Sequence, residues 1–171
     1  MSKIPIVLIL IVLLSSCEKP PINLKAYQNE GKDFEISIPK EWDVKVSEEE
    51  IIAKQGGWED FFSKLKVSAT YKRNWGTFEP ITEEILSAIN KSGSLKYQNN
   101  LRKITTDTYT MYTYDLRGPA PLGGTVTFRK YEVNIHDKPE DSFILVVDSF
   151  NEFNSDEERF MKAIIASLKF L

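Results

Sequence analysis

The chain contains one cysteine and one histidine, Cys17 and His136. A zinc site built from several histidines therefore has too few ligands within one chain. Cys17 directly follows an apolar run over Ile4–Leu14 and two small residues, Ser15 and Ser16. A thiol placed just behind a hydrophobic leader is in a position where secretory precursors are processed.

His136 is followed by Asp137 and, slightly later, by Glu140 and Asp141. Imidazole and carboxylate groups can bind a cation or form an acid–base pair. The alternative is a solvated turn, which Pro139 also favours. We expect the turn, and we predict no catalytic residue, no metal site and no cofactor.

The N-terminal residues have the parts of a secretory signal: a positive charge at Lys3, the apolar run and small residues before the cleavage point. The run is about half the ~20 residues that a membrane-spanning helix needs. The segment Leu14-Ser15-Ser16-Cys17 resembles the lipobox of bacterial lipoprotein precursors. This resemblance implies cleavage before Cys17, a diacylglyceryl group on its thiol and an acyl chain such as palmitate on its amino group.

Lipidation at Cys17 predicts a protein that stays on a membrane without a spanning helix, because two or more acyl chains anchor stably. We expect residues 1–16 to be the signal peptide and residues 17–23 the lipidated tether. The segment Glu18-Lys19-Pro20-Pro21 lacks the acidic cluster that resembles a surface-export tag. The predicted location is therefore the bacterial cell envelope, facing the periplasm.

Residues 24–171 are expected to form one domain, since their number suits a single hydrophobic core. The 171-residue chain has 22 basic and 25 acidic side chains and a formal net charge of −3. This balance provides no basic surface for nucleic acid.

Alternating and helical patterns predict an α+β domain. We expect strands over 34–38, 42–46, 64–72, 104–117, 125–136 and 143–150, with a turn-rich link at 118–124. Thr82 is expected to cap one helix. A capping box from Ser155 to Glu158 is expected to begin another, whose apolar stripe packs on the sheet. Glu48, Glu49 and Glu50 are expected to form a solvated turn or a helix start.

The segment Phe34-Glu35-Ile36-Ser37-Ile38-Pro39-Lys40-Glu41-Trp42-Asp43-Val44 resembles the opening hairpin of the PsbP-like (Mog/PsbP) superfamily. The ending is also similar: a strand finishing in Asp148-Ser149-Phe150, then a helix closing on residues 164–170. The resemblance implies an antiparallel sheet sandwiched by helices, an α-β-α sandwich. It also implies binding or assembly roles on larger partners, generally without catalysis.

Aromatic and turn residues offer candidate binding surfaces. Trp58 and Phe61 follow a glycine pair, and Leu122 lies in the 118–124 link. Exposed aromatic side chains often anchor protein interfaces. The alternative for Trp58 is a core position, because large aromatic side chains are usually mostly buried. Trp75 with the tyrosines of residues 109–114 suggests an aromatic groove, but the strand alternation divides these tyrosines between two faces.

These observations predict a lipid-anchored, non-enzymatic module that docks a protein partner at the cell envelope. The alternative is a carrier that binds a small molecule or a lipid against the sheet. A third possibility is a hydrolase that uses His136 with Ser142 or Ser149, although neither serine has the glycines of a nucleophile elbow.

Overall fold

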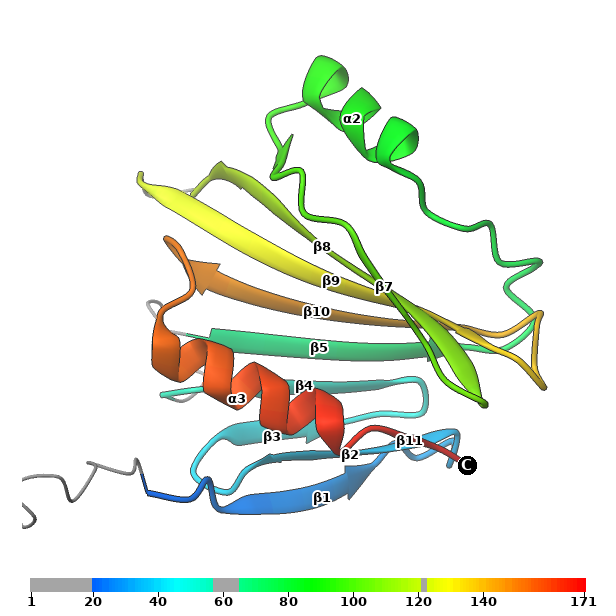
Figure 1. Cartoon of the computed structure of the whole chain (residues 1–171). Helices are drawn as coiled ribbons and strands as arrows, with labels where there is room; N and C mark the ends of the chain where they lie inside the picture. Colours follow the sequence, from blue (N-terminus) through cyan, green and yellow to red (C-terminus); the bar gives the residue numbers. More distant parts are fainter. Residues whose placement is uncertain (1–19, 57–64, 121–122) are drawn as a thin grey trace, which may run out of the picture.

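The computed structural model describes residues 20–56, 65–120 and 123–171. Its main feature is an eight-stranded antiparallel sheet (Figure 1). The strands are β3 (Asp43–Val46), β4 (Glu50–Lys54), β5 (Leu65–Lys72), β6 (Lys96–Tyr97), β7 (Arg102–Thr105), β8 (Tyr109–Pro119), β9 (Thr125–Ile135) and β10 (Ser142–Phe150). Their order is β3-β4-β5-β10-β9-β8-β6, and β7 also pairs with β8. The antiparallel sheet of the α+β expectation is confirmed.

Alternation of apolar and polar residues determines how the central strands sit in the sheet. In β5, Leu65, Val67, Ala69 and Tyr71 are buried, and the residues between them are half-buried. β10 lies between β5 and β9 and alternates in the same way. Because successive side chains of a strand point to opposite faces, one face of the sheet carries the main core.

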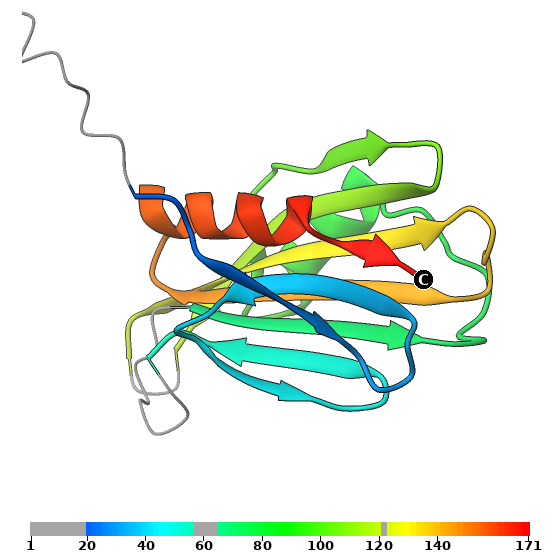
Figure 2. The ribbon, with the colours of Figure 1, turned by 90° about the horizontal axis from the view of Figure 1, so that it is seen from below.

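A second, three-stranded sheet and one helix cover that face. The sheet has the order β1-β2-β11, formed by β1 (Leu24–Gln28), β2 (Phe34–Pro39) and β11 (Lys169–Phe170). The helix is α3 (Ser155–Ala166), whose Met161 and Ile164 are buried in the main core with Ile36 and Ile38 of β2. Both elements lie on the same side of the main sheet (Figure 2).

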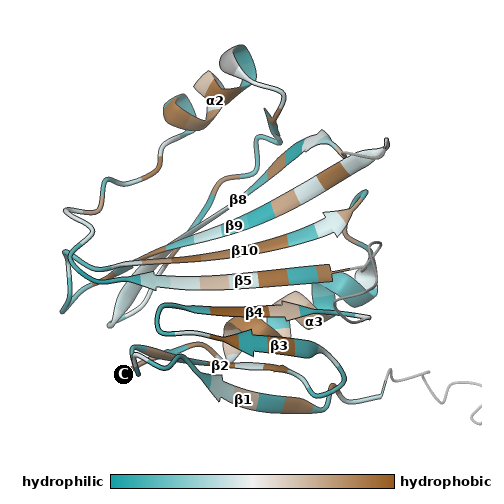
Figure 3. Cartoon of the chain, turned by 180° about the vertical axis from the view of Figure 1, so that it is seen from behind, coloured by the Kyte–Doolittle hydropathy of each residue, from teal (hydrophilic) through white to brown (hydrophobic). Residues whose placement is uncertain are grey.

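The other helix, α2 (Glu83–Ser92), packs on the opposite face. Its Leu86 is buried with Tyr97, Tyr114 and Leu116 in a separate apolar cluster. Among the described residues, helix covers this face only at the β6–β8 end, and hydrophilic and hydrophobic bands are visible over the other strands (Figure 3). Neither of these two described helices is long and apolar enough to cross a membrane.

The long strand expected over 104–117 is wrong, because a hairpin interrupts it. The Thr106 N–H donates to Tyr109 O at 2.9 Å, and the Thr106 hydroxyl oxygen accepts from the Thr108 and Tyr109 amides. A threonine side chain that satisfies backbone groups competes with a continuous strand. Glu48 and Glu49 form the exposed turn that was expected, whereas Glu50 begins β4.

The cap of α3 lies one residue before the predicted one. The Asn154 side chain accepts from the amides of Asp156 and Glu157, and Glu157 Oε2 accepts from the Asn154 N–H at 2.8 Å. The capping box therefore uses Asn154 and Glu157, not Ser155 and Glu158. The cap of α2 at Thr82 is confirmed, with its hydroxyl 3.3 Å from the Ile85 amide nitrogen.

The C-terminal strand generates a stability prediction. Phe170 packs against Tyr71, Tyr109 and Phe143, so Phe170→Ala should lower the free energy of unfolding by about 3 kcal/mol. Urea unfolding followed by circular dichroism measures the change. Leu171→Ala is the matched control, because its side chain is 50% exposed and its loss should cost under ~0.5 kcal/mol. Equal losses in the two variants would contradict this account of the C-terminus.

Candidate functional site

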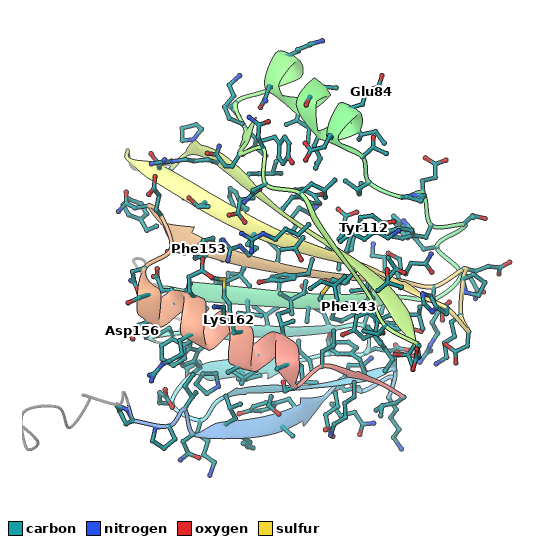
Figure 4. All side chains as sticks on the ribbon, in the orientation of Figure 1. Glu84, Tyr112, Phe143, Phe153, Asp156 and Lys162 are labelled. Atoms are coloured by element: carbon teal, nitrogen blue, oxygen red, sulfur yellow. The ribbon has the colours of Figure 1, made fainter. Side chains whose placement is uncertain are left out.

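A groove lies on the core face of the main sheet, between α3 and the strands β7, β8 and β9. We call it the helix groove. It has a volume of about 280 Å³. Its apolar lining comes from Met111, Tyr131, Met161 and Ile165, and its polar lining includes Arg102, Arg129, Glu158 and Lys162. Figure 4 labels Lys162 on α3.

Strand register and helical spacing bring these side chains together. In the β8–β9 ladder, Thr113 lies opposite Tyr131 and Asp115 lies opposite Arg129, so all four share one face. On α3, the groove residues 158, 161, 162 and 165 follow the spacing that places side chains on one side of a helix.

The guanidinium of Arg129 joins β8, β9 and α3 at one end of the groove. Its Nε and Nη2 donate to the two carboxylate oxygens of Asp115 at 2.7 and 2.8 Å. Its Nη1 donates to both oxygens of Glu158 at 2.8 Å. The same guanidinium lies 4.8 Å from the ring centre of Phe153. Two-point hydrogen bonding of this kind fixes orientation as well as distance.

Burial makes this cluster structural rather than reactive. The side chains of Arg129 and Asp115 are only 17% and 11% exposed. The hydrogen bond to Asp115 raises the pKa of Arg129, so its charge is permanent. Both carboxylates of the cluster, Asp115 and Glu158, are engaged by that charge.

Tyr131 presents the phenol nearest this cluster, and it stays protonated at neutral pH. Burial raises its pKa to about 12, although the neighbouring Arg129 charge acts in the opposite direction. A phenol with this pKa is a poor base at pH 7. The groove is therefore suited to binding, through its apolar lining and fixed charges.

Two cations at the groove are not neutralised by the described residues. Arg102 on β7 and Lys162 on α3 both line the groove, and neither forms an ion pair within the described parts of the chain. Arg102 is exposed, as is Lys162. Beside them, Ile104 is 49% exposed. This edge of the groove thus combines positive charge with exposed apolar surface.

The sequence candidates around His136 lie elsewhere. The ring of His136 contacts Thr110 Oγ1 through Nε2 at 3.0 Å and Asp107 O through Nδ1 at 3.1 Å. Asp141 accepts from the Tyr71 hydroxyl at 2.7 Å and from the Asn74 amide at 2.9 Å. Across the described ranges, no group of three or more His, Cys, Asp or Glu side chains is arranged to hold a metal ion.

The two candidate serines are at opposite ends of β10, a separation of roughly 23 Å for an extended strand. Ser149 is buried, and its hydroxyl donates to Glu157 Oε1 at 3.1 Å. This bond helps to hold the start of α3 against the sheet, and gives Ser149 a structural role.

Four sequence-predicted site residues, Cys17, Trp58, Phe61 and Leu122, lie outside the described residues. The predicted division of the tyrosines is confirmed. Tyr109 packs against Phe170 of the main core, whereas Tyr112 stacks on Phe78 and Tyr114 meets Tyr97 on the opposite face.

Trp75 does not complete an aromatic groove with these tyrosines. It is 64% exposed, and Lys72 Nζ lies 4.0 Å from its ring centre.

No family model matches the chain, and no curated protein matches its sequence. Several solved structures match its fold. Cyanobacterial PsbP (CyanoP) from Synechocystis sp. PCC 6803 gives a TM-score of 0.56 at 10% identity, covering 93% of this chain and 99% of that one. The chain has a PsbP-like fold.

Another match is LpqN, a protein described as involved in cell envelope biogenesis of Mycobacterium tuberculosis. It gives a TM-score of 0.54 at 10% identity, covering 86% of this chain and 90% of LpqN. At such low identity, these two likenesses establish the fold alone.

The sequence analysis missed Arg129 and its partners, although one signal was present. Asp115 and Arg129 are at equal distances from residue 122, inside the predicted 118–124 link. Opposite charges placed symmetrically about a hairpin turn face each other across the ladder. The third member of the cluster, Glu158, could not be predicted in this way, because its contact with Arg129 depends on where α3 packs.

Removing the central charge should destabilise the domain. Arg129→Met leaves Asp115 and Glu158 without their cation, and losing one partner of a buried ion pair costs about 3–5 kcal/mol. The matched control is Arg117→Met, because Arg117 pairs with a Glu152 side chain that is 76% exposed and such surface pairs contribute about 0–1 kcal/mol. Chemical unfolding of both variants measures the difference. Similar losses would show that Arg129 does not tie α3 to the sheet.

Proposed function

We propose that this protein is a lipid-anchored, non-enzymatic module of the bacterial cell envelope that docks a protein partner in the helix groove. The observation that carries the proposal is the groove itself: an apolar lining bordered by Arg102 and Lys162, with the Arg129 cluster holding α3 at a fixed distance from the strands. Apolar surface with defined charges at its border is typical of protein interfaces.

The way the tether meets the domain supports an anchored role. Arg159 of α3 donates to the carbonyl oxygen of Pro20 at 3.0 Å, and the Lys40 amide donates to that of Asn23 at 2.9 Å. The chain is thus attached to the domain from Pro20 onward. An extended chain covers at most about 3.6 Å per residue, so a lipidated Cys17 would hold Pro20 within about 11 Å of the acylated residue.

The envelope assignment draws on two observations. The segment ending in Cys17 has the order of charge, apolar run and small residues found in lipoprotein precursors. LpqN, which shares the fold, is described as involved in cell envelope biogenesis. Both support a module that works on an envelope-facing membrane surface, and we propose the periplasm-facing one.

A carrier function is the second candidate, since the groove is mostly apolar. Its volume of about 280 Å³ is near the lower limit of the 300–1,000 Å³ that pockets for small molecules usually have. A docking surface is the better fit to a groove of this volume with an exposed border. Mass spectrometry of the denatured protein separates the two, because a carrier releases a ligand.

Photo-cross-linking tests the docking proposal. A photoreactive amino acid at position 162, incorporated into the lipidated protein in its native membranes, should yield one dominant cross-linked envelope protein. The same amino acid at Glu84, which is exposed on α2 across the sheet, is the control and should not capture that protein. Capture of the same set of proteins from both positions would contradict a partner at the groove.

The anchor has its own test. Cys17→Ala should abolish labelling by a palmitate analogue and move the protein out of the membrane fraction, because the thiol that accepts the lipid is gone. Ser16→Ala is the control, since it retains a small residue before the cleavage point, and it should leave labelling unchanged. Unaltered membrane association of the Cys17→Ala protein would contradict lipid anchoring.

A further inference from the structure

The free edge of the sheet beside the helix groove is strand β7. Among the described strands, β7 pairs only with β8, and all four of its residues are exposed. The Thr106 N–H donates to Tyr109 O and closes the β7–β8 hairpin. In an antiparallel ladder, bonded and non-bonded residue pairs alternate. Lys103 and Thr105 therefore turn their backbone amide and carbonyl groups away from β8.

Side chains of β7 alternate between two environments. Arg102 and Ile104 line the helix groove, whereas Lys103 lies on the other face, with its Nζ 5.7 Å from the ring centre of Tyr112. A strand added along β7 would accordingly present every second side chain to the groove.

Three basic side chains lie at this edge, whereas the carboxylate of Glu158 in the groove is paired with Arg129 and Asp107 lies in the adjoining turn. Arg102 and Lys103 are on β7, and Lys162 lies on the other side of the groove; none of the three forms an ion pair with a described residue. The chain as a whole has a formal net charge of −3. A local group of unpaired cations on an acidic protein selects for a negatively charged partner.

Basic residues on an edge strand also protect it against self-association. That role alone does not account for Ile104, which is 49% exposed between the cations and next to an apolar groove. Charged side chains alone are enough to keep an edge strand from pairing with other chains. An edge strand that binds a partner strand also needs apolar surface. Strand β7 combines a free backbone edge, an exposed isoleucine and unpaired cations. This combination favours an edge that binds a partner strand.

We propose that β7 receives an extended acidic segment of the partner protein as an added antiparallel or parallel strand. Main-chain hydrogen bonds join the segment to Lys103 and Thr105. Its carboxylates meet Arg102, Lys103 and Lys162, and one apolar side chain lies over Ile104 in the groove. Strand addition of this kind takes affinity from the backbone and specificity from alternate side chains. The inference rests on the proposed docking function and names the chemistry of the partner.

A model peptide tests the inference on the full-length protein. A labelled hexapeptide with the repeat Glu-Glu-Val, which can place glutamates opposite Arg102 and Lys103 and a valine opposite Ile104, should bind when measured by fluorescence anisotropy. Binding should weaken as salt rises. The matched lysine–valine peptide should not bind. Replacing both Arg102 and Lys103 by glutamate reverses the charge of the strand and should weaken binding by about tenfold or more. The control Lys91→Glu, on α2, should leave the affinity unchanged.

A proline variant separates strand addition from simple charge attraction. Thr105→Pro removes an amide that points outward, a position where an edge strand tolerates proline, and keeps all the cations. It should abolish binding while the circular dichroism spectrum and melting temperature stay near those of the parent. Unchanged binding by Thr105→Pro, or no binding by the parent, would overturn strand addition. Neither result alters the cross-linking readout at position 162, so the docking proposal stands or falls separately.

Discussion

The guanidinium of Arg129 joins three elements: the hairpin strands β8 and β9 through Asp115, and the helix α3 through Glu158. A buried charge must be fully paired to be tolerated, and here both partners are supplied by the fold. The pairing determines how far α3 lies from the strands. The width and lining of the helix groove depend on that distance.

Much of the scaffold could be predicted from residue patterns. The alternation in residues 65–71 and the apolar run in residues 143–150 predicted β5 and β10, and Thr82 predicted the start of α2. The long strand over 104–117 was wrong because Thr106 closes a turn through its own side chain. The α3 cap shifted by one residue because Asn154, rather than Ser155, satisfies the first amides.

The candidate site was less accessible to sequence reasoning, since its residues come from β7, β8, β9 and α3. Arg102 and Lys162 are ordinary surface residue types, and only their approach across an apolar groove makes them distinctive. Conversely, two residues that the sequence offered as candidates for catalysis or cation binding form hydrogen bonds within the fold. Asp141 accepts from Tyr71, and Ser149 donates to Glu157. The spacing of residues indicates which side chains share one face of a strand or helix. Which distant elements contact each other depends on how they pack in the folded domain.

The central claim is that the groove edge is occupied when the anchored protein is in its envelope. Hydrogen exchange measured by mass spectrometry over residues 102–106 tests this most directly, with the protein either in its native membranes or extracted in mild detergent. We predict slow exchange in the membranes and fast exchange after extraction, with α2 unchanged between the two. Equal exchange of this strand in both states would contradict the account.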